Sequence, residues 1–293
     1  MTGQRANLRS VYAMLLAIAM FSLMDTVMKL LAAHYPAMQV AALRGLTSLP
    51  LVLAYVGWRG GSSSVFKVRW PLHILRGVLG IAMLSLFAFA LKKLSLAEAY
   101  TIFFIAPALI TALSVVFLKE VVDAARWSAI GVGLVGVIIV LRPTGAGMLT
   151  LGGLAVLGAA ACYAVSAIAV RILGRTDSGD NMILWLMLMM SVGASSLAAP
   201  GWLAIRASDL MLLLAMAVTG FIGQIAITEA FNKGEASKIA PLEYTALAWG
   251  VLLDWLLWQA LPDRYTLIGA AIIIASGVYL IRSEHQHATA EHP

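Results

Sequence analysis

Long apolar stretches alternate with short polar breaks along almost the whole chain. A membrane-spanning helix needs about 20 mostly apolar residues, and each stretch is close to this length. The breaks hold Gly, Pro, Ser and charged residues, which are typical of turns and loops. This pattern predicts ten transmembrane helices, over residues 11–31, 38–57, 72–91, 97–118, 124–141, 150–172, 181–199, 209–230, 237–259 and 265–281.

Composition favours the same class of fold. The chain has 293 residues, of which 61% are hydrophobic and only 12% are charged, and its mean hydropathy is +0.92. Ten spans would use about two-thirds of the chain, which leaves little for a domain outside the membrane. The first apolar stretch is followed by many others, so we interpret it as a helix and not as a removable signal peptide. We therefore expect an all-α membrane protein.

The ten predicted helices fall into two sets of five that resemble each other. At an offset of 142 residues, Phe21 matches Tyr163 and Lys29 matches Arg171. Because five crossings is an odd number, the second set must enter the membrane from the opposite side, which is the inverted repeat of many secondary transporters. We predict a first repeat over residues 1–145, a second, inverted repeat over residues 146–284 and a polar tail over residues 285–293.

The net charge of +6 is best explained by basic loops. Lys and Arg gather on the side of the N-terminus, for example at Arg59, Arg76 and Lys119. Such loops are usually cytoplasmic, so we expect both termini in the cytoplasm and the protein in the inner (plasma) membrane. No basic run with interleaved aromatic residues occurs, so nucleic acid is not an expected partner. Cys162 is the only cysteine, which excludes an intramolecular disulfide.

Several short motifs carry a resemblance to a known family. Polar hairpins at residues 92–95 and 232–236 precede the fourth predicted helix of each half. The first of these helices contains IAPAL at residues 105–109 and ends in LKE at residues 118–120, and a glycine-rich helix follows. With the five-plus-five layout, these features resemble the drug/metabolite transporter superfamily in its ten-helix EamA-type branch, over residues 10–283. Within that branch the chain is similar to amino-acid exporters of the YddG type. The resemblance implies export of small organic metabolites.

Charged side chains inside a bilayer need a partner or a cavity. Asp25 and Arg44 fall at a similar depth of the first two predicted helices, so we expect them to form a hydrogen-bonded pair. Two roles stay open for this pair, a structural clamp or a part of the solute pathway that meets a zwitterion or exchanges a proton. Glu229 and Lys233 have the spacing of a helix surface pair. Asp25, Glu229 and Glu243 are the candidates for ion coupling.

Aromatic residues mark one face of the fourth predicted helix. Tyr100, Phe103, Phe104 and Pro107 follow the spacing i, i+3, i+4, i+7. Pro107 has no N–H, so we expect it to interrupt the helix and to free the carbonyl of Phe103. A free carbonyl beside aromatic rings can hold an ammonium group. Packing of the rings against lipid or another helix is the alternative.

Together these patterns predict a secondary active transporter that exports small organic metabolites, foremost amino acids, including aromatic and apolar ones, by alternating access. A nucleotide-sugar carrier, a cationic-drug carrier and an intramembrane enzyme are the alternatives, and no catalytic motif supports the enzyme. We expect a central site between the first, third, fourth, sixth, eighth and ninth helices. The predicted substrate-binding residues are Phe21, Asp25, Arg44, Leu84, Phe87, Tyr100, Phe103, Phe104, Pro107, Tyr163, Gln224, Tyr244 and Trp249. We expect no cofactor and no metal, and a monomer or weak homodimer whose partners are a small-molecule substrate and membrane lipid.

Overall fold

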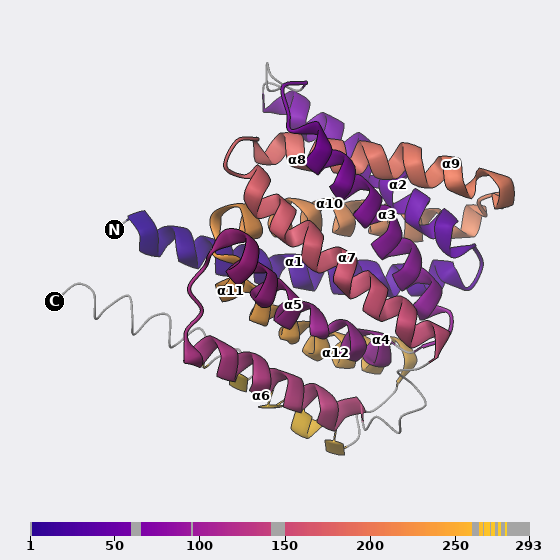
Figure 1. Ribbon diagram of the computed structural model, residues 1–293. Coiled ribbons are helices and arrows are strands. Elements are labelled where there is room, and N and C mark those ends of the chain that lie inside the picture. The colour runs from indigo at the N-terminus through magenta and orange to yellow at the C-terminus, as the bar shows by residue number, and fades with distance from the viewer. Residues whose placement is uncertain are drawn as a thin grey trace.

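The computed structural model describes residues 2–59, 66–94, 96–141 and 150–259, and residues 264, 265, 267–269, 271, 272, 275, 276 and 279. All regular secondary structure in these residues is helical, which confirms the predicted class (Figure 1). The helices are α1 (Thr2–Ala32), α2 (Ala37–Trp58), α3 (Trp70–Leu91), α4 (Leu96–Phe103), α5 (Ile105–Leu113), α6 (Ala124–Leu141), α7 (Leu151–Leu173), α8 (Gly179–Met189), α9 (Ser195–Ala198), α10 (Leu210–Lys233), α11 (Ala236–Ile239) and α12 (Ala246–Trp258). Turns of π-helix follow α5 (Ser114–Leu118) and α8 (Met190–Ala194), and 3₁₀ segments cover Ala199–Gly201, Ala207–Asp209 and Ala240–Thr245. The predicted tail 285–293 lies outside the described residues.

Six helical stretches of the described residues are long and apolar enough to cross a membrane. They are Arg9–Ala32, Ala37–Trp58, Trp70–Leu91, Leu151–Leu173, Gly179–Gly201 and Ala207–Lys233. Two shorter apolar stretches, Ile105–Leu118 and Trp127–Gly136, belong to the fourth and fifth predicted helices. The predicted tenth helix is described only in part. The chain is thus a helical, multi-pass membrane protein, and the count of ten spans stays a prediction.

The fourth predicted helix is interrupted and does not run unbroken over residues 97–118. It divides into α4 and α5 at Phe104. Three residues later, Pro107 has no backbone N–H to donate to the carbonyl of Phe103, which removes the hydrogen bond that would carry the helix across this point. The interruption expected from the position of Pro107 is confirmed.

The ninth predicted helix is also interrupted, which the continuous span 237–259 did not anticipate. It consists of α11, the 3₁₀ segment Ala240–Thr245 and α12. Pro241 stands at the start of the 3₁₀ segment and removes one α-helical hydrogen bond there. Both interrupted helices end in a residue with left-handed backbone, Lys119 with φ 56° and Gln259 with φ 52°. The two halves therefore share this backbone feature although their residues differ.

Helix α1 packs along α10 in the antiparallel direction. Near the start of α1, Arg9 Nε lies 2.9 Å from the Oε1 atom of Glu229, close to the end of α10. Beyond the end of α1, the Tyr35 hydroxyl donates a hydrogen bond of 2.7 Å to Asp209, which precedes α10.

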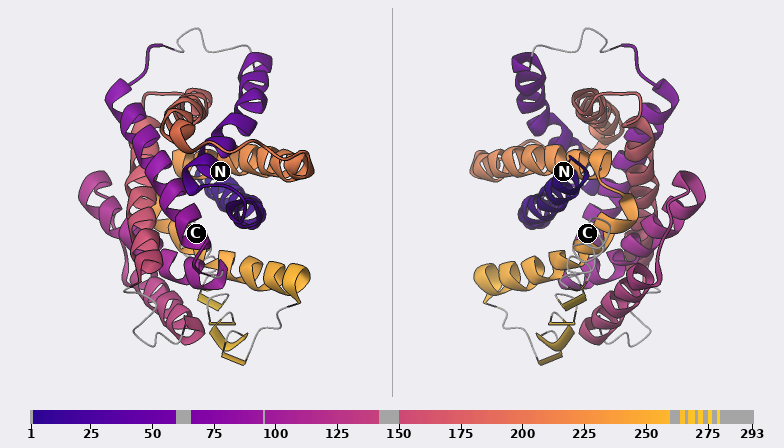
Figure 2. Two further views of the ribbon diagram at one scale, coloured as in Figure 1. Left: turned by 90° about the vertical axis from the view of Figure 1, so that its right-hand side faces the viewer. Right: turned by 90° about the vertical axis from the view of Figure 1, so that its left-hand side faces the viewer.

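Helix α3 packs along α7 in the same antiparallel manner. His73, in the first turn of α3, lies 2.8 Å from Asp177, which follows α7. At the opposite end, Leu94 packs against Gly152, where an added Cβ would lie 3.2 Å from the Leu94 side chain. Both views of Figure 2 show α3 and α7 running steeply across the direction of α10 and α12.

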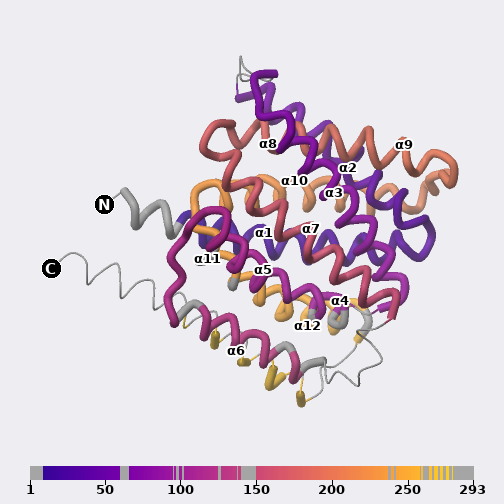
Figure 3. Tube along the Cα trace, viewed as in Figure 1, coloured from indigo at the N-terminus to yellow at the C-terminus, as the bar shows by residue number. Residues whose placement is uncertain are grey.

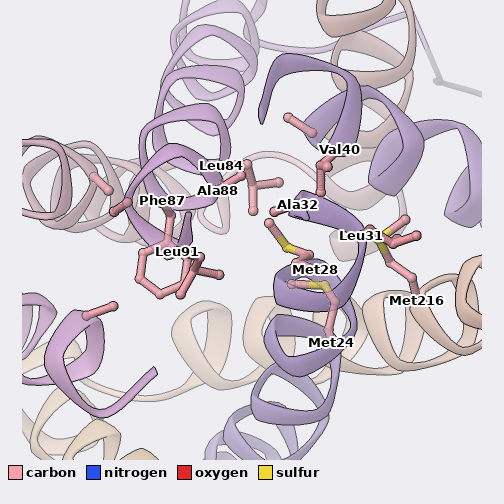
Figure 4. Close-up of a cluster of buried hydrophobic side chains, with 14 of the residues drawn as sticks. Met24, Met28, Leu31, Ala32, Val40, Leu84, Phe87, Ala88, Leu91 and Met216 are labelled. Carbon is pink, nitrogen blue, oxygen red and sulfur yellow. The ribbon is translucent and has the colours of Figure 1, made fainter. Parts of the chain in front are cut away.

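Two buried apolar clusters fill the interior. The first cluster surrounds the end of α1 and includes Met28, Leu31, Val40, Leu91 and Met216 (Figure 4). The second cluster surrounds the first half of α1 and the end of α10, and its members include Met14, Ala17, Leu173, Ile227 and Phe231. The side chain of Phe21 packs against both clusters, so the two meet near the middle of α1.

Helix α6 lies at the edge of the molecule, beside the described residues between 264 and 279 (Figure 3). The Ser276 hydroxyl donates a hydrogen bond of 2.7 Å to the carbonyl of Ala129. Gly133 leaves room for Tyr244, whose ring would lie 2.5 Å from an added Cβ. Small residues on α6 therefore allow close packing on both sides of this helix.

Candidate solute-binding cavity

A cavity of about 170 Å³ lies where the two apolar clusters meet. Since one enclosed water needs about 10–15 Å³ on this scale, the cavity has room for a small organic molecule. Its lining comes from α1, α3, α4, α7, α10 and the 3₁₀ segment Ala240–Thr245, which correspond to the six helices expected from the sequence. Helices α2 and α8, which were not among these six, contribute as well, through the predicted site residue Arg44 and through Leu186.

The structure brings most of the predicted site residues together. Those that line the cavity are Phe21, Asp25, Arg44, Leu84, Phe87, Tyr100, Phe103, Phe104, Tyr163, Gln224 and Glu243. Pro107, Tyr244, Trp249 and Glu229 do not line it. Pro107 is buried in α5 and acts on the backbone, and Tyr244 packs behind Phe104 with their ring centroids 5.4 Å apart.

The expected pair of Asp25 and Arg44 does not form. No ion pair joins these two described residues within 4.0 Å, so that prediction was wrong. Asp25 instead accepts a hydrogen bond of 3.0 Å from the Tyr100 hydroxyl of α4. The depth estimate gave the height of both residues, but it could not show that the rotation of α1 directs Asp25 towards α4.

Arg44 has other partners. Its Nη2 donates to the carbonyl of Gly220 at 3.4 Å and to the side-chain oxygen of Gln224 at 3.3 Å, and its Nη1 lies 3.2 Å from the sulfur of Met187. The guanidinium carbon lies 6.0 Å from the centroid of the Phe21 ring. Arg44 therefore joins α2 to α8 and α10 at the cavity wall.

Glu243 is held in the same way as Asp25. It accepts a hydrogen bond of 2.7 Å from the Tyr163 hydroxyl of α7. The two carboxylate–tyrosine bonds join corresponding helices of the halves, the first to the fourth and the sixth to the ninth. The acid and the phenol have exchanged places, because the acid lies on the first helix in one half and on the ninth in the other.

Glu229 lies outside the cavity at the end of α10. Its carboxylate contacts Lys233 at 2.6 Å, which confirms the predicted surface pair, and Arg9 at 2.9 Å. Glu229 therefore forms ion pairs outside the cavity with both basic side chains.

The aromatic residues form a continuous wall along one side of the cavity. Phe87 stacks on Tyr100 with ring centroids 6.3 Å apart, and it meets Phe103 edge-on at 5.6 Å. Phe103 in turn lies 5.5 Å from Tyr163. The wall therefore runs from α3 through α4 to α7 and combines both halves of the chain.

Comparison with known proteins agrees with this architecture. The chain matches the EamA-like transporter family twice, over residues 8–142 and over residues 150–283. The chain belongs to the EamA-like transporter family. This confirms the resemblance to the EamA-type branch of the drug/metabolite transporters, and the family is one of transporters and not of enzymes.

Several curated relatives of this EamA-like transporter match over most of its length. A riboflavin transporter of Vibrio cholerae is 28% identical over 87% of this chain and 86% of that protein. The pseudopaline exporter CntI of Pseudomonas aeruginosa is 24% identical, over 92% of this chain and 94% of its own. An S-adenosylmethionine uptake transporter of Rickettsia conorii is 26% identical, over 95% and 94% respectively. A chain known from a crystal structure, at 20% identity, superposes with a TM-score of 0.77 over 94% of this transporter and 97% of that chain, and so has the same fold.

One charged residue of the transporter's cavity was not predicted as a site residue from the sequence. Arg76 was counted among the basic loops and was not among the predicted site residues. Arg76 instead lies inside α3, lines the cavity and is only 2% exposed. Its position inside the predicted span 72–91 was the available signal.

A polar cluster joins the first turn of α3 to the loop after α7 in this EamA-like transporter. The carboxylate of Asp177 accepts hydrogen bonds from His73 at 2.8 Å, from the Thr176 hydroxyl at 2.7 Å and from the backbone N–H of Arg69 at 3.2 Å. Burial alone would raise the pKa of Asp177, but these hydrogen bonds outweigh burial and hold its pKa below the ordinary value.

Proposed function

We propose that the protein is a secondary active carrier that exports small zwitterionic metabolites, foremost amino acids with aromatic or apolar side chains. The observation that carries this proposal is the lining of the cavity, which combines buried groups of both charge signs with a wall of aromatic rings. Asp25 and Glu243 offer carboxylates to an ammonium group, and Arg76 offers a guanidinium to a carboxylate. The rings between them suit an apolar side chain by stacking and cation–π contact.

The helix directions support two inverted repeats with ten spans. In an inverted repeat, α1 corresponds to α7 and α3 corresponds to α10. The contact of α1 with α10 is then the symmetry mate of the contact of α7 with α3. Both pairs are antiparallel, as inversion requires, whereas a direct repeat would make them parallel. Transporters with this symmetry alternate their access by moving one repeat against the other around a fixed central site.

The two apolar clusters support alternating access. The first cluster includes Met24 and Phe87 and the second includes Ile18 and Phe231, and all four side chains line the cavity, so apolar side chains flank it on the side of each cluster. A charged solute cannot cross an intact apolar barrier at low cost. We propose that the two barriers open in turn, and that Asp25 and Glu243 bind a proton or the ammonium group of the solute during the cycle.

The relatives widen the list of solutes to be tested. Their names include S-adenosylmethionine, which carries an amino-acid group, and riboflavin, which carries a flat aromatic ring system. Riboflavin is the second candidate, because the wall of Phe87, Tyr100 and Phe103 can stack on such rings. A nucleotide sugar fits less well, because the guanidinium of Arg44 is already occupied by protein acceptors. A cationic drug would leave Arg76 without a partner.

Flux into proteoliposomes tests the proposal. Purified protein in liposomes is offered radiolabelled amino acids, S-adenosylmethionine and riboflavin, with and without a proton gradient. Saturable uptake of an amino acid that excess unlabelled amino acid blocks is the expected result. Uptake of riboflavin alone would replace the amino-acid proposal, and no uptake of any solute by folded protein would contradict both. We place the protein in the inner membrane with both termini in the cytoplasm, as a monomer or weak homodimer.

A further inference from the structure

Arg76 is a buried charge that the protein itself does not neutralise. Its side chain is 2% exposed and lines the cavity. Nη1 donates a hydrogen bond of 3.2 Å to the carbonyl of Met182, but Nε has no partner. In the part of the chain that the structure describes, no carboxylate lies within 4.0 Å of this guanidinium.

The acid that lies beside the first turn of the same helix, Asp177 of the loop after α7, is already engaged. His73, one turn before Arg76, holds the carboxylate of Asp177 at 2.8 Å. Thr176 and the backbone of Arg69 occupy the same carboxylate. Asp177 is therefore engaged by the polar cluster at the start of α3, and no ion pair within 4.0 Å joins it to Arg76.

A buried guanidinium in this state is unfavourable. Guanidinium carries five N–H donors and stays charged, so burial without an anion leaves desolvated charge and unused donors. Arg44 shows the contrast, because it is as deeply buried but donates to Gly220 and Gln224 and contacts Met187. The protein thus satisfies one cavity arginine with its own acceptors and leaves the other for something that enters the cavity.

The surroundings of Arg76 leave space for that ligand. Gly80 follows one turn later on the same face of α3 and also lines the cavity, with the side chain of Leu186 packed close to it. Beyond it, Met83, Leu84 and Phe87 continue the same face towards the aromatic wall. A solute bound by its anionic group at Arg76 would direct its apolar part along this face.

We propose that Arg76 binds the carboxylate of the transported solute and thereby selects solutes that carry one. This rests on the proposed carrier function and names the residue that reads the anionic group. A carboxylate matches the planar fork of a guanidinium through two parallel hydrogen bonds, including one from the unpartnered Nε. A phosphate group would satisfy the same donors, so the experiment must separate the two anions.

The first measurement needs no ligand. The thermal midpoint of purified Arg76→Met is compared with those of wild type and of the matched variant Arg44→Met. Removal of an unpaired buried charge should leave the midpoint of Arg76→Met unchanged or raise it. Arg44→Met should lower the midpoint by about 3 °C or more, because acceptors on α8 and α10 lose their donor. A fall in Arg76→Met as large as that in Arg44→Met would overturn the proposal, since Arg76 would then have its partner in the empty protein.

The second measurement uses ligands that differ only in the carboxylate. Thermal midpoints of wild type and Arg76→Gln are recorded with phenylalanine, leucine and methionine, with the matching amino alcohols, and with inorganic phosphate at constant ionic strength. We expect the acids to stabilise wild type at concentrations about tenfold or more below those of the alcohols, and Arg76→Gln to lose this preference. Arg76→Lys should keep part of the preference for acids over alcohols.

Equal effects of acid and alcohol on wild type, or a preference that survives in Arg76→Gln, would overturn the proposal. Stronger stabilisation by phosphate, lost in Arg76→Gln, would overturn the carboxylate assignment.

The two proposals fail in different ways. Absence of flux for every solute in proteoliposomes would remove the carrier function but leaves the ligand-free comparison of Arg76→Met and Arg44→Met standing. If no probe stabilises wild type, the carboxylate site at Arg76 is overturned, whatever the ligand-free comparison shows. Flux of an amino acid that is as fast in Arg76→Gln as in wild type, at concentrations below saturation, would keep the carrier function and remove Arg76 from its site.

Discussion

At the scale of single residues, the cavity is organised by hydrogen bonds from tyrosine hydroxyls to carboxylates. Tyr100 holds Asp25 and Tyr163 holds Glu243. Each phenol fixes the direction of a buried acid and supplies one of its hydrogen bonds, which lowers the cost of keeping the acid away from water. The acids thus remain in place in the empty cavity, with capacity left for a further donor.

Replacement of Tyr100 by Phe should therefore lower stability. The change removes the hydroxyl that donates to Asp25 at 3.0 Å, and loss of a hydrogen bond to a buried polar group costs about 1–3 kcal/mol. Thermal unfolding of the purified protein measures this as a lower midpoint. Tyr244→Phe is the matched control, because the Tyr244 hydroxyl is buried without a partner and its removal should be neutral or stabilising. Equal midpoints for Tyr100→Phe and wild type would show that Asp25 does not depend on this bond.

The lowered pKa of Asp177 makes the stability of the fold depend on pH. Its pKa in the folded protein lies below the ordinary value of 3.8, so its hydrogen bonds stabilise the fold fully above that value. This contribution is lost as the pH falls through the lower, folded pKa. Asp177→Asn should therefore lower the thermal midpoint at pH 7, by the equivalent of about 2 kcal/mol, and the difference from wild type should shrink below about pH 4.

The matched control for that series is Asp180→Asn. Asp180 is partly exposed and lies 3.7 Å from Arg59, and surface pairs of this kind contribute little. If Asp177→Asn and Asp180→Asn have the same midpoint across the pH range, the polar cluster at the start of α3 does not stabilise the fold as we infer.

At the scale of elements, the interrupted helices α4–α5 and α11–α12 surround the site. Irregular backbone at membrane depth is tolerated where it is covered by protein or lines a cavity. Phe104 and Glu243, both cavity residues, lie at the two interruptions. The breaks therefore place side chains and backbone polar groups at the cavity instead of within a continuous helix.

Pro107→Ala should restore one backbone hydrogen bond, to the carbonyl of Phe103, and favour a continuous fourth helix. Proline in a helix interior costs about 3 kcal/mol, so the variant should be at least as stable as wild type. Its flux should be slower, because a straight helix moves Phe103 and Phe104 relative to the cavity. Thermal midpoint and proteoliposome flux are measured on the same preparation.

A less stable Pro107→Ala variant with unchanged flux would show that the break does not shape the site. Pro50→Ala, at a proline inside α2 away from the cavity lining, is the control for proline removal alone.

The sequence was sufficient where a local rule decides the outcome. The spacing of Tyr100, Phe103 and Phe104 placed them on one face, and the missing N–H of Pro107 placed the break. The partner of Asp25 could not be predicted in this way, because rise per residue gives height along a helix and not the direction in which a side chain points. Arg76 was missed for a related reason, since burial of a charge near a helix end depends on how α7 and α8 cover it.

At the scale of the whole molecule, the antiparallel packing of α1 with α10 and of α3 with α7 links the two halves. Each half supplies one helix to each pair, so neither half encloses the cavity alone. The offset of the repeat predicted which helices of the two halves correspond. Contacts between helix ends, such as Arg9 with Glu229, show that the paired helices run antiparallel. What periodicity could not supply is which helices of opposite halves touch, since that is set by packing of side chains across the interface.

The inverted repeat makes a prediction that side-specific labelling can test. Lys67, between α2 and α3, and Ser208, between α9 and α10, are both exposed, and they are 141 residues apart, so they occupy corresponding loops of the two halves. In an inverted repeat corresponding loops lie on opposite sides of the membrane, whereas in a direct repeat they lie on the same side.

With Cys162 replaced by Ala, a membrane-impermeant maleimide applied to intact cells should label Ser208→Cys but not Lys67→Cys. Permeabilisation should expose Lys67→Cys, because positive loops are cytoplasmic. Labelling of both variants from outside would exclude inversion, and labelling of Lys67→Cys alone would keep inversion and reverse the orientation. The side of the membrane on which Lys67→Cys is labelled also shows which of the two apolar clusters must open first for a solute that arrives from the cytoplasm.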